Sequence, residues 1–132
     1  MGAAGRDANL LLNIGPRPDG TIQPEALKRL RAIGRWLDTY GPSIYRTRGG
    51  PITPREWGVT TQRGDTVFVH VLEWRDRALA IPSFGRRILK ATMLGTGETV
   101  DVAQRHGSIT LTMPAPSEDS PDRVVELITG AE

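Results

Sequence analysis

The chain contains no cysteine and only two histidines, and both shortages exclude kinds of site. Without cysteine it has neither a disulfide framework nor a zinc–thiolate site. The histidines, His70 and His106, stand far apart in the sequence, so neither a catalytic triad nor a histidine metal site can be read from it. We therefore expect no bound metal and no cofactor.

Long hydrophobic runs and a strong charge of one sign are also missing. No apolar run approaches the ~20 residues that cross a bilayer. Lys and Arg number 17 against 15 Asp and Glu, and the basic residues are scattered except on one predicted helix. A nucleic-acid surface usually concentrates basic residues and adds stacking aromatics. We interpret the basic helix face as solvated, and we expect no membrane and no nucleic-acid partner.

The first elements read as a buried strand followed by an amphipathic helix. Residues 9–14 form a short apolar run before a Gly/Pro-rich loop, which favours a strand buried on both faces. Pro24 suits the first position of a helix, and Gly41 with Pro42 suits its end. The pattern predicts a helix over residues 24–40, with apolar side chains at three- and four-residue spacing.

A strand and a helix of this kind make half a βα unit. A strand that is buried on both faces needs two neighbouring strands and a covering layer. Residues 1–8 are too few to supply another strand and crossover. We therefore expect the rest of this unit to be absent from the chain.

The remainder of the sequence has the period of a β protein. Residues 43–57 read as an irregular linker, and short strand patterns with tight turns follow, which predicts an antiparallel sandwich. Val67, Val69 and Val71 share one face of a strand, while Phe68 and His70 share the other. The predicted strands are Trp57–Thr61, Thr66–Glu73, Ala78–Ile81, Arg87–Leu94, Glu98–Val102, Ser108–Met113 and Val124–Ile128.

Six segments stand out as ordered motifs along the chain. They are Asn9-Leu-Leu-Leu-Asn-Ile-Gly-Pro-Arg-Pro-Asp-Gly-Thr-Ile22, Ile33-Gly-Arg-Trp-Leu37, Tyr40-Gly-Pro-Ser-Ile-Tyr45, Thr47-Arg-Gly-Gly-Pro51, Trp57-Gly-Val-Thr-Thr61 and Val69-His-Val-Leu72. Together these segments resemble glycoside hydrolase family 29, the α-L-fucosidases, in their bacterial type. The resemblance covers nearly the whole chain in order, densely from residue 9 to about 74 and loosely afterwards.

The resemblance implies a mainly β chain: a C-terminal antiparallel β-sandwich after one strand and one helix left over from a (β/α) barrel. The expected domains are the last strand and helix of the catalytic barrel over 1–45, a linker over 46–56, and the sandwich over 57–132. It also implies a parent enzyme that releases terminal α-L-fucose with retention. Such enzymes use two carboxyl groups, a nucleophile and an acid/base.

In the family those two residues lie upstream of this segment, so the resemblance assigns no catalytic residue here and predicts that the isolated chain is inactive. The alternative is a non-catalytic sandwich that buttresses the barrel or binds carbohydrate. The parent's partner would be a fucosylated glycan. A periplasmic or secreted parent is expected, although the sequence itself leaves the compartment open. An apolar face without its barrel would invite self-association.

Asn13 is the one candidate substrate-binding residue. It lies near the C-terminal end of the predicted strand, where it would support the floor of the sugar site, and structural hydrogen bonding is the alternative for both Asn9 and Asn13. Asp19 and Glu25 flank the following loop. We interpret Asp19 as a turn residue that bonds its own backbone and Glu25 as a partner of the helix dipole.

The remaining candidates are histidines, tryptophans and one further carboxylate. His70 is predicted to be a satisfied sheet histidine and His106 an exposed turn residue. Trp36 and Trp57 are interpreted as interface or core residues, and Trp74 is the best candidate for an exposed aromatic that stacks on sugar. Asp7 is a weaker catalytic candidate still.

Overall fold

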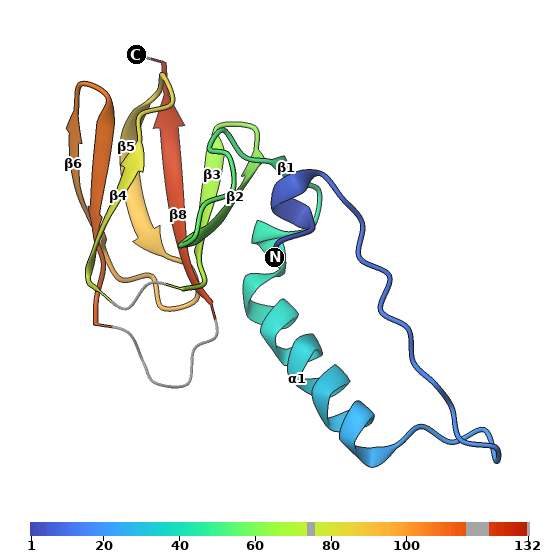
Figure 1. Cartoon of the computed structure of the whole chain (residues 1–132). Helices are drawn as coiled ribbons and strands as arrows, with labels where there is room; N and C mark the ends of the chain where they lie inside the picture. Colours follow the sequence, from blue (N-terminus) through green and yellow to red (C-terminus); the bar gives the residue numbers. More distant parts are fainter. Residues whose placement is uncertain (74–75, 116–121, 132) are drawn as a thin grey trace.

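The computed structural model describes residues 1–73, 76–115 and 122–131. Two antiparallel sheets form a sandwich, and one helix with an extended segment projects from its side (Figure 1). The larger sheet has the order β1-β2-β3-β8-β5 and the smaller one β4-β7-β6. The strands are β1 Arg48–Gly49, β2 Gly58–Arg63, β3 Thr66–Val71, β4 Ala78–Pro82, β5 Arg87–Met93, β6 Asp101–Arg105, β7 Ser108–Thr112 and β8 Arg123–Gly130. The helices are η1 Ala4–Arg6, α1 Pro24–Tyr40 and η2 Gly41–Ser43.

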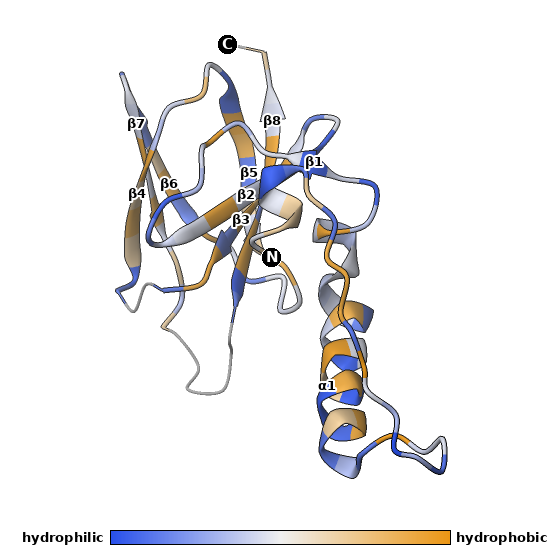
Figure 2. Ribbon diagram, turned by 45° about the vertical axis from the view of Figure 1, so that its right-hand side comes forward, coloured by the Kyte–Doolittle hydropathy of each residue, from blue (hydrophilic) through white to orange (hydrophobic). Residues whose placement is uncertain are grey.

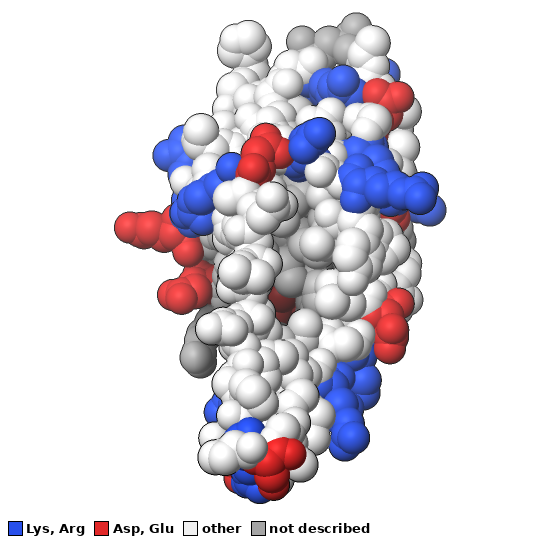
Figure 3. Space-filling view, turned by 90° about the vertical axis from the view of Figure 1, so that its right-hand side faces the viewer, with Lys and Arg blue, Asp and Glu red and all other residues white. Residues whose placement is uncertain are grey.

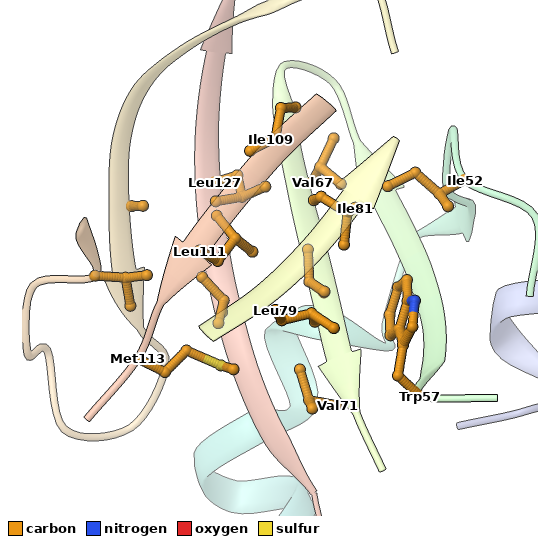
Figure 4. Close-up of a cluster of buried hydrophobic side chains, with 14 residues drawn as sticks. Ile52, Trp57, Val67, Val71, Leu79, Ile81, Ile109, Leu111, Met113 and Leu127 are labelled. Atoms are coloured by element: carbon orange, nitrogen blue, oxygen red, sulfur yellow. The ribbon is translucent and has the colours of Figure 1, made fainter. Parts of the chain in front are cut away.

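The hydrophobic core fills the space between the two sheets (Figure 4). Period-2 alternation in β3 sends Val67, Val69 and Val71 into this core. Phe68 and His70 point to the opposite face of the same strand and are also fully buried. The larger sheet is therefore covered on both sides at β3, once by the smaller sheet and once by the N-terminal part of the chain.

Most predicted strands are confirmed within one or two residues, and one is displaced. The pattern placed a strand at Glu98–Val102, whereas β6 runs over Asp101–Arg105. Thr99 forms an isolated bridge with Thr92 of β5, so the chain first stays beside β5 before it joins β7. Pairing of β6 with β7 then continues to Arg105, opposite Ser108.

The expected irregular linker contributes one short strand. Arg48 and Gly49 form β1 and pair with Gln62 and Thr61 at the edge of the larger sheet. Two residues are too few for alternation to be visible in a sequence, which is why the pattern missed β1. The carboxylate of Asp7 accepts a hydrogen bond of 2.8 Å from the Gly49 amide, which ties the N-terminus to this edge.

The predicted helix is confirmed as α1, Pro24–Tyr40. Pro24 occupies its first position and Glu25 its first turn, as the sequence predicts. None of its residues is buried. An amphipathic helix normally covers its apolar stripe with other elements, so the stripe of α1 lacks the cover that its sequence predicts.

The predicted strand over Asn9–Ile14 is wrong for this chain. The segment has no strand assignment, and Leu10, Leu11 and Leu12 are 76%, 93% and 54% exposed. A strand forms through hydrogen bonds to a neighbour, and no described strand pairs with this segment. It runs extended instead and approaches α1 near Leu10, which lines one hollow together with Ile33 and Trp36. Figure 2 shows hydrophobic residues along the segment and along the helix.

The N-terminal part of the chain packs on the outer face of the larger sheet. Gly5 of η1 is buried there, directly against Val59 of β2. The approach is so close that a Cβ added to Gly5 would lie 2.5 Å from the Cβ of Val59. The Thr61 hydroxyl of β2 donates a 2.6 Å hydrogen bond to the Ser43 carbonyl in η2. The end of α1 is thereby anchored to the sandwich, while the rest of the helix points away from it (Figure 1).

Candidate functional site

Asn13, the predicted substrate-binding residue, is exposed in the extended segment. Asn9 is exposed at the start of the same segment. Neither amide has a hydrogen bond to the described residues, so the structural alternative of buried, bonded amides is not realised in this chain. The two side chains stay solvated, as expected where no neighbouring strand flanks the segment.

Asp19 lies in the Pro-Asp-Gly turn and bonds locally, as predicted. Its Oδ1 accepts hydrogen bonds from the Thr21 hydroxyl at 2.7 Å and from the Thr21 amide at 3.0 Å. The hydroxyl bond first, and then the amide bond, lower the pKa of this fully exposed carboxyl below its ordinary value. Asp19 is therefore a well-ionised turn residue, which is the opposite of what a general acid needs.

Replacing Thr21 with alanine is expected to raise the pKa of Asp19 towards its ordinary value, because the larger of the two lowering hydrogen bonds is lost. Because the folded pKa is lowered, the turn is stabilised above the unfolded pKa, and this support is lost as pH falls through the folded pKa. A carboxyl NMR titration measures the shift. Thr21→Ser keeps the hydroxyl and should leave the pKa unchanged; an equal rise in both variants would contradict the assignment.

The other two carboxylate candidates also have local roles. Glu25 is exposed in the first turn of α1, where the helix dipole favours a negative charge. Asp7 sits in a left-handed backbone conformation, with φ 53°, and accepts the Gly49 amide. Both side chains are exposed, and neither lies in the apolar pocket that a catalytic acid commonly occupies.

The two histidines fall into different environments. His106 is exposed in the turn between β6 and β7, as predicted. His70 is fully buried, and its Nδ1 lies 2.9 Å from Oδ2 of the buried Asp122. The sequence predicted a satisfied sheet histidine without naming its partner, because Asp122 is 52 residues away and no local pattern joins the two.

The tryptophans are mostly committed to packing. Trp57 is 8% exposed and belongs to the core between the sheets, as predicted (Figure 4). Trp36 is half-buried and stacks on Tyr40, with ring centroids 4.9 Å apart. Trp74, the candidate sugar platform, lies outside the described residues. Stacking on a sugar ring needs an open aromatic face, which Trp57 lacks.

A largely apolar hollow lies between the N-terminal segment and the end of α1. It holds about 510 Å³ and is bounded by the start of the chain, by one face of the helix and by the linker after η2. Ile33, Trp36 and Leu37 line it from α1, and Leu10 lines it from the extended segment. Figure 3 faces this side: charged residues gather towards its upper and lower ends, and its middle is largely uncharged.

A second, more polar groove lies at the edge of the sandwich. Its volume is about 970 Å³, and it runs between the residues that precede β2 and the residues of β4. Arg6, Arg55, Glu56 and Glu73 line it, and all four are exposed. The sequence analysis missed this grouping because the four residues come from three separate segments, which only the folded chain brings together.

No group of three or more His, Cys, Asp or Glu residues that could hold a metal ion occurs among the described residues. Within the same part of the chain, no helix combines the length and apolar character that a membrane crossing requires.

Comparisons with known proteins point to one family. The sequence model described as Alpha-L-fucosidase matches residues 2–42, the part that holds η1, the extended segment and α1. An α-L-fucosidase of Branchiostoma floridae is 37% identical over 118 residues, covering 84% of this chain and 26% of that protein. The plasma α-L-fucosidase of Homo sapiens is 34% identical over 101 residues, covering 70% of this chain and 22% of that protein.

Solved structures give the same result over nearly the whole chain. A GH29 α-L-fucosidase of Bacteroides thetaiotaomicron, solved as a trapped covalent intermediate with 2-fluoro-fucosyl fluoride, superposes with a TM-score of 0.87 at 27% identity and covers 98% of this chain. The α-L-fucosidase isoenzyme 1 of Paenibacillus thiaminolyticus gives 0.85 at 25% identity and 97% coverage. The chain spans 30% and 32% of those two chains, and about a quarter of the curated relatives.

Proposed function

Since the chain belongs to the α-L-fucosidases and corresponds to their C-terminal portion, we propose that its parent protein is a retaining glycosidase that releases terminal α-L-fucose. In this proposal the chain buttresses the catalytic barrel and supplies neither the nucleophile nor the acid/base. The observation that carries it is the superposition of 98% of the chain on 30% of a GH29 α-L-fucosidase that was trapped as a covalent intermediate.

The chemistry of the described carboxylates supports a non-catalytic role. Retaining glycosidases hold two carboxyl groups about 5 Å apart, and one of them must carry a raised pKa to donate a proton. Asp19 has a lowered pKa and two bonds to Thr21, and Asp7 is held by the Gly49 amide. Asp122 is buried against His70. We therefore assign the nucleophile and the acid/base to the part of the relatives that this chain does not span.

The architecture fits a supporting role. One end of α1 is anchored to the outer face of the sandwich through Thr61 and Ser43, while its apolar stripe stays uncovered. In this proposal residues 1–45 belong with the catalytic barrel, residues 46–56 link the two parts, and residues 57–132 form the sandwich. Asn13 then supports the floor of the sugar site once neighbouring strands flank its segment.

The partner in this proposal is a fucosylated glycan, bound by the parent enzyme rather than by the isolated chain. The alternative, a sandwich that binds carbohydrate by itself, has one observation in its favour. The groove beside β4 is lined by the four exposed charged residues already named, and charged planar groups of this kind hydrogen-bond sugar hydroxyls. One observation stands against it. The aromatic residue that lines this groove, Trp57, is only 8% exposed and offers no open face for a sugar ring to stack on.

The test is hydrolysis of a chromogenic α-L-fucoside by the purified chain. We expect no turnover above buffer, and an equal result for the double variant Asp19→Asn/Glu25→Gln. Turnover that follows the chain through purification and disappears in the double variant would overturn the proposal. If the turnover persists in that variant, the exposed Glu56 and Glu73 of the groove become the candidates.

Titration of the same protein with a fucosylated trisaccharide separates the proposal from its alternative. A buttress without a sugar site gives no binding heat. Saturable binding that is weakened by Arg55→Ala, while the exposed Arg105→Ala on β6 leaves it unchanged, would favour the carbohydrate-binding module.

A further inference from the structure

Four buried polar residues on the outer face of the larger sheet form one continuous chain of hydrogen bonds. Ser43, Thr61 and His70 are fully buried, and Asp122 is 3% exposed. Oδ2 of Asp122 lies 2.9 Å from His70 Nδ1, and His70 Nε2 lies 3.4 Å from the Thr61 hydroxyl oxygen. The Thr61 hydroxyl donates to the Ser43 carbonyl at 2.6 Å.

This chain of bonds crosses three neighbouring strands and ends at the helix. Asp122 immediately precedes β8, His70 is in β3 and Thr61 is in β2, and these strands are adjacent in the sheet. Ser43 closes η2, and its own hydroxyl donates at 2.7 Å to the carbonyl of Tyr40, the last residue of α1. The bonds therefore connect β3, the central strand of the larger sheet, to the end of the helix that the proposed barrel would contact.

The positions of the hydrogens follow from counting donors. A carbonyl oxygen cannot donate, so the single hydrogen of the Thr61 hydroxyl is used in its bond to Ser43. The contact between Thr61 and His70 then needs the hydrogen on Nε2. The contact of Nδ1 with the Asp122 carboxyl needs a second hydrogen, which the ring supplies from Nδ1 when the carboxylate oxygen is the acceptor.

We propose that this chain of bonds, Asp122–His70–Thr61–Ser43, is a lock that fixes how α1 joins the sandwich, and that it closes when both ring nitrogens of His70 carry a hydrogen. Asp122 is the charged group that the described residues place against the ring. β2 and η2 contribute the uncharged Thr61 and Ser43, and the neighbouring Arg123 donates to the Asp76 carbonyl.

If the His70 ring loses the hydrogen on Nε2, the chain of bonds has a second, open arrangement. With Nδ1–H kept for Asp122, Nε2 becomes an acceptor and faces the Thr61 oxygen without a hydrogen between them. Rotation of the Thr61 hydroxyl towards Nε2 restores that bond and releases the Ser43 carbonyl. The ring with a hydrogen on both nitrogens is therefore the form that closes the lock.

The direct test is NMR of the two histidine rings in the unmodified chain. At pH 7 we expect both ring nitrogens of His70 to carry hydrogens, whereas the exposed His106 serves as the internal reference in the same spectrum. A neutral His70 with a single ring hydrogen at pH 7 would overturn the proposal without any need for a variant.

The second test measures whether the ring is coupled to the helix end. The amides of Ile44 and Tyr45 bond to the Gly41 carbonyl, so their hydrogen exchange reports opening of η2. Thr61→Val should accelerate this exchange roughly tenfold, since a buried hydrogen bond is lost. Thr61→Ser keeps the hydroxyl and should behave as the unmodified chain. Unchanged exchange in Thr61→Val would refute the coupling.

Discussion

Replacing Gly58 with alanine is expected to lower the free energy of unfolding by about 4 kcal/mol, a loss that only severe local conflicts produce. Gly58 opens β2 with a φ of 150°, a conformation that side chains rarely adopt. A Cβ at this position would collide with the backbone carbonyl oxygen of His70 in the paired strand β3. Backbone atoms in the middle of a sheet cannot move aside, so the pairing of β2 with β3 would have to shift.

Chemical denaturation monitored by far-ultraviolet circular dichroism measures this effect. The matched control is Gly64→Ala in the turn between β2 and β3, where φ is 57° but no atom lies within 4 Å of the added Cβ. In this control the alanine must adopt a left-handed backbone conformation, which costs about 1–2 kcal/mol, but its Cβ collides with nothing. Similar losses in the two variants would show that the collision is relieved by movement and would contradict the expected rigidity of this strand pair.

The isolated chain is also expected to self-associate, and we propose a second copy as the occupant of its uncovered apolar side. Leu10 and Leu11 are 76% and 93% exposed, and their segment has backbone groups that no described strand pairs. Burying a leucine stabilises an association by about 1.5–3 kcal/mol. The double variant Leu10→Lys/Leu11→Lys should therefore weaken association by at least about a hundredfold.

Sedimentation over a range of protein concentrations measures this association. Leu89→Lys is the control, because Leu89 is 62% exposed on β5 of the sandwich, away from the extended segment. As a single substitution it removes one exposed leucine and adds one positive charge, so its matched partner is the single variant Leu11→Lys. A monomer at every concentration, or an equal loss of association in the control, would contradict the proposal.

Much of the fold was predictable because its causes are local. Pro24, the three- and four-residue apolar spacing and Gly41-Pro42 predict α1 with its observed bounds, since capping and helical period act within a few residues. The alternation in β3 predicts which side chains share a face. Asp19 could be assigned to its turn for the same reason: its partner, Thr21, is two residues away.

Apart from the displaced bounds of β6, the errors and omissions concern partners that are distant in the sequence. Residues 9–14 have the composition of a buried strand, but a strand exists only through its neighbours, and the chain offers none among its described strands. The place of Asn13 in a sugar site depends on the same missing neighbours, so it stays a prediction. The short β1 was missed because Arg48 and Gly49 are strand residues only by virtue of their pairing with β2.

The sequence by itself therefore determined the helix, the positions of most strands along the chain and the resemblance to α-L-fucosidases, because local spacing and ordered motifs carry that information. Only the tertiary structure decided that His70 meets Asp122 across 52 residues and that Thr61 ties β2 to the end of α1. It also decided that Leu10 and Leu11 face solvent. The physical reason is that burial and hydrogen-bond partnership are properties of packed neighbours, which a sequence pattern specifies only when those neighbours lie nearby along the chain.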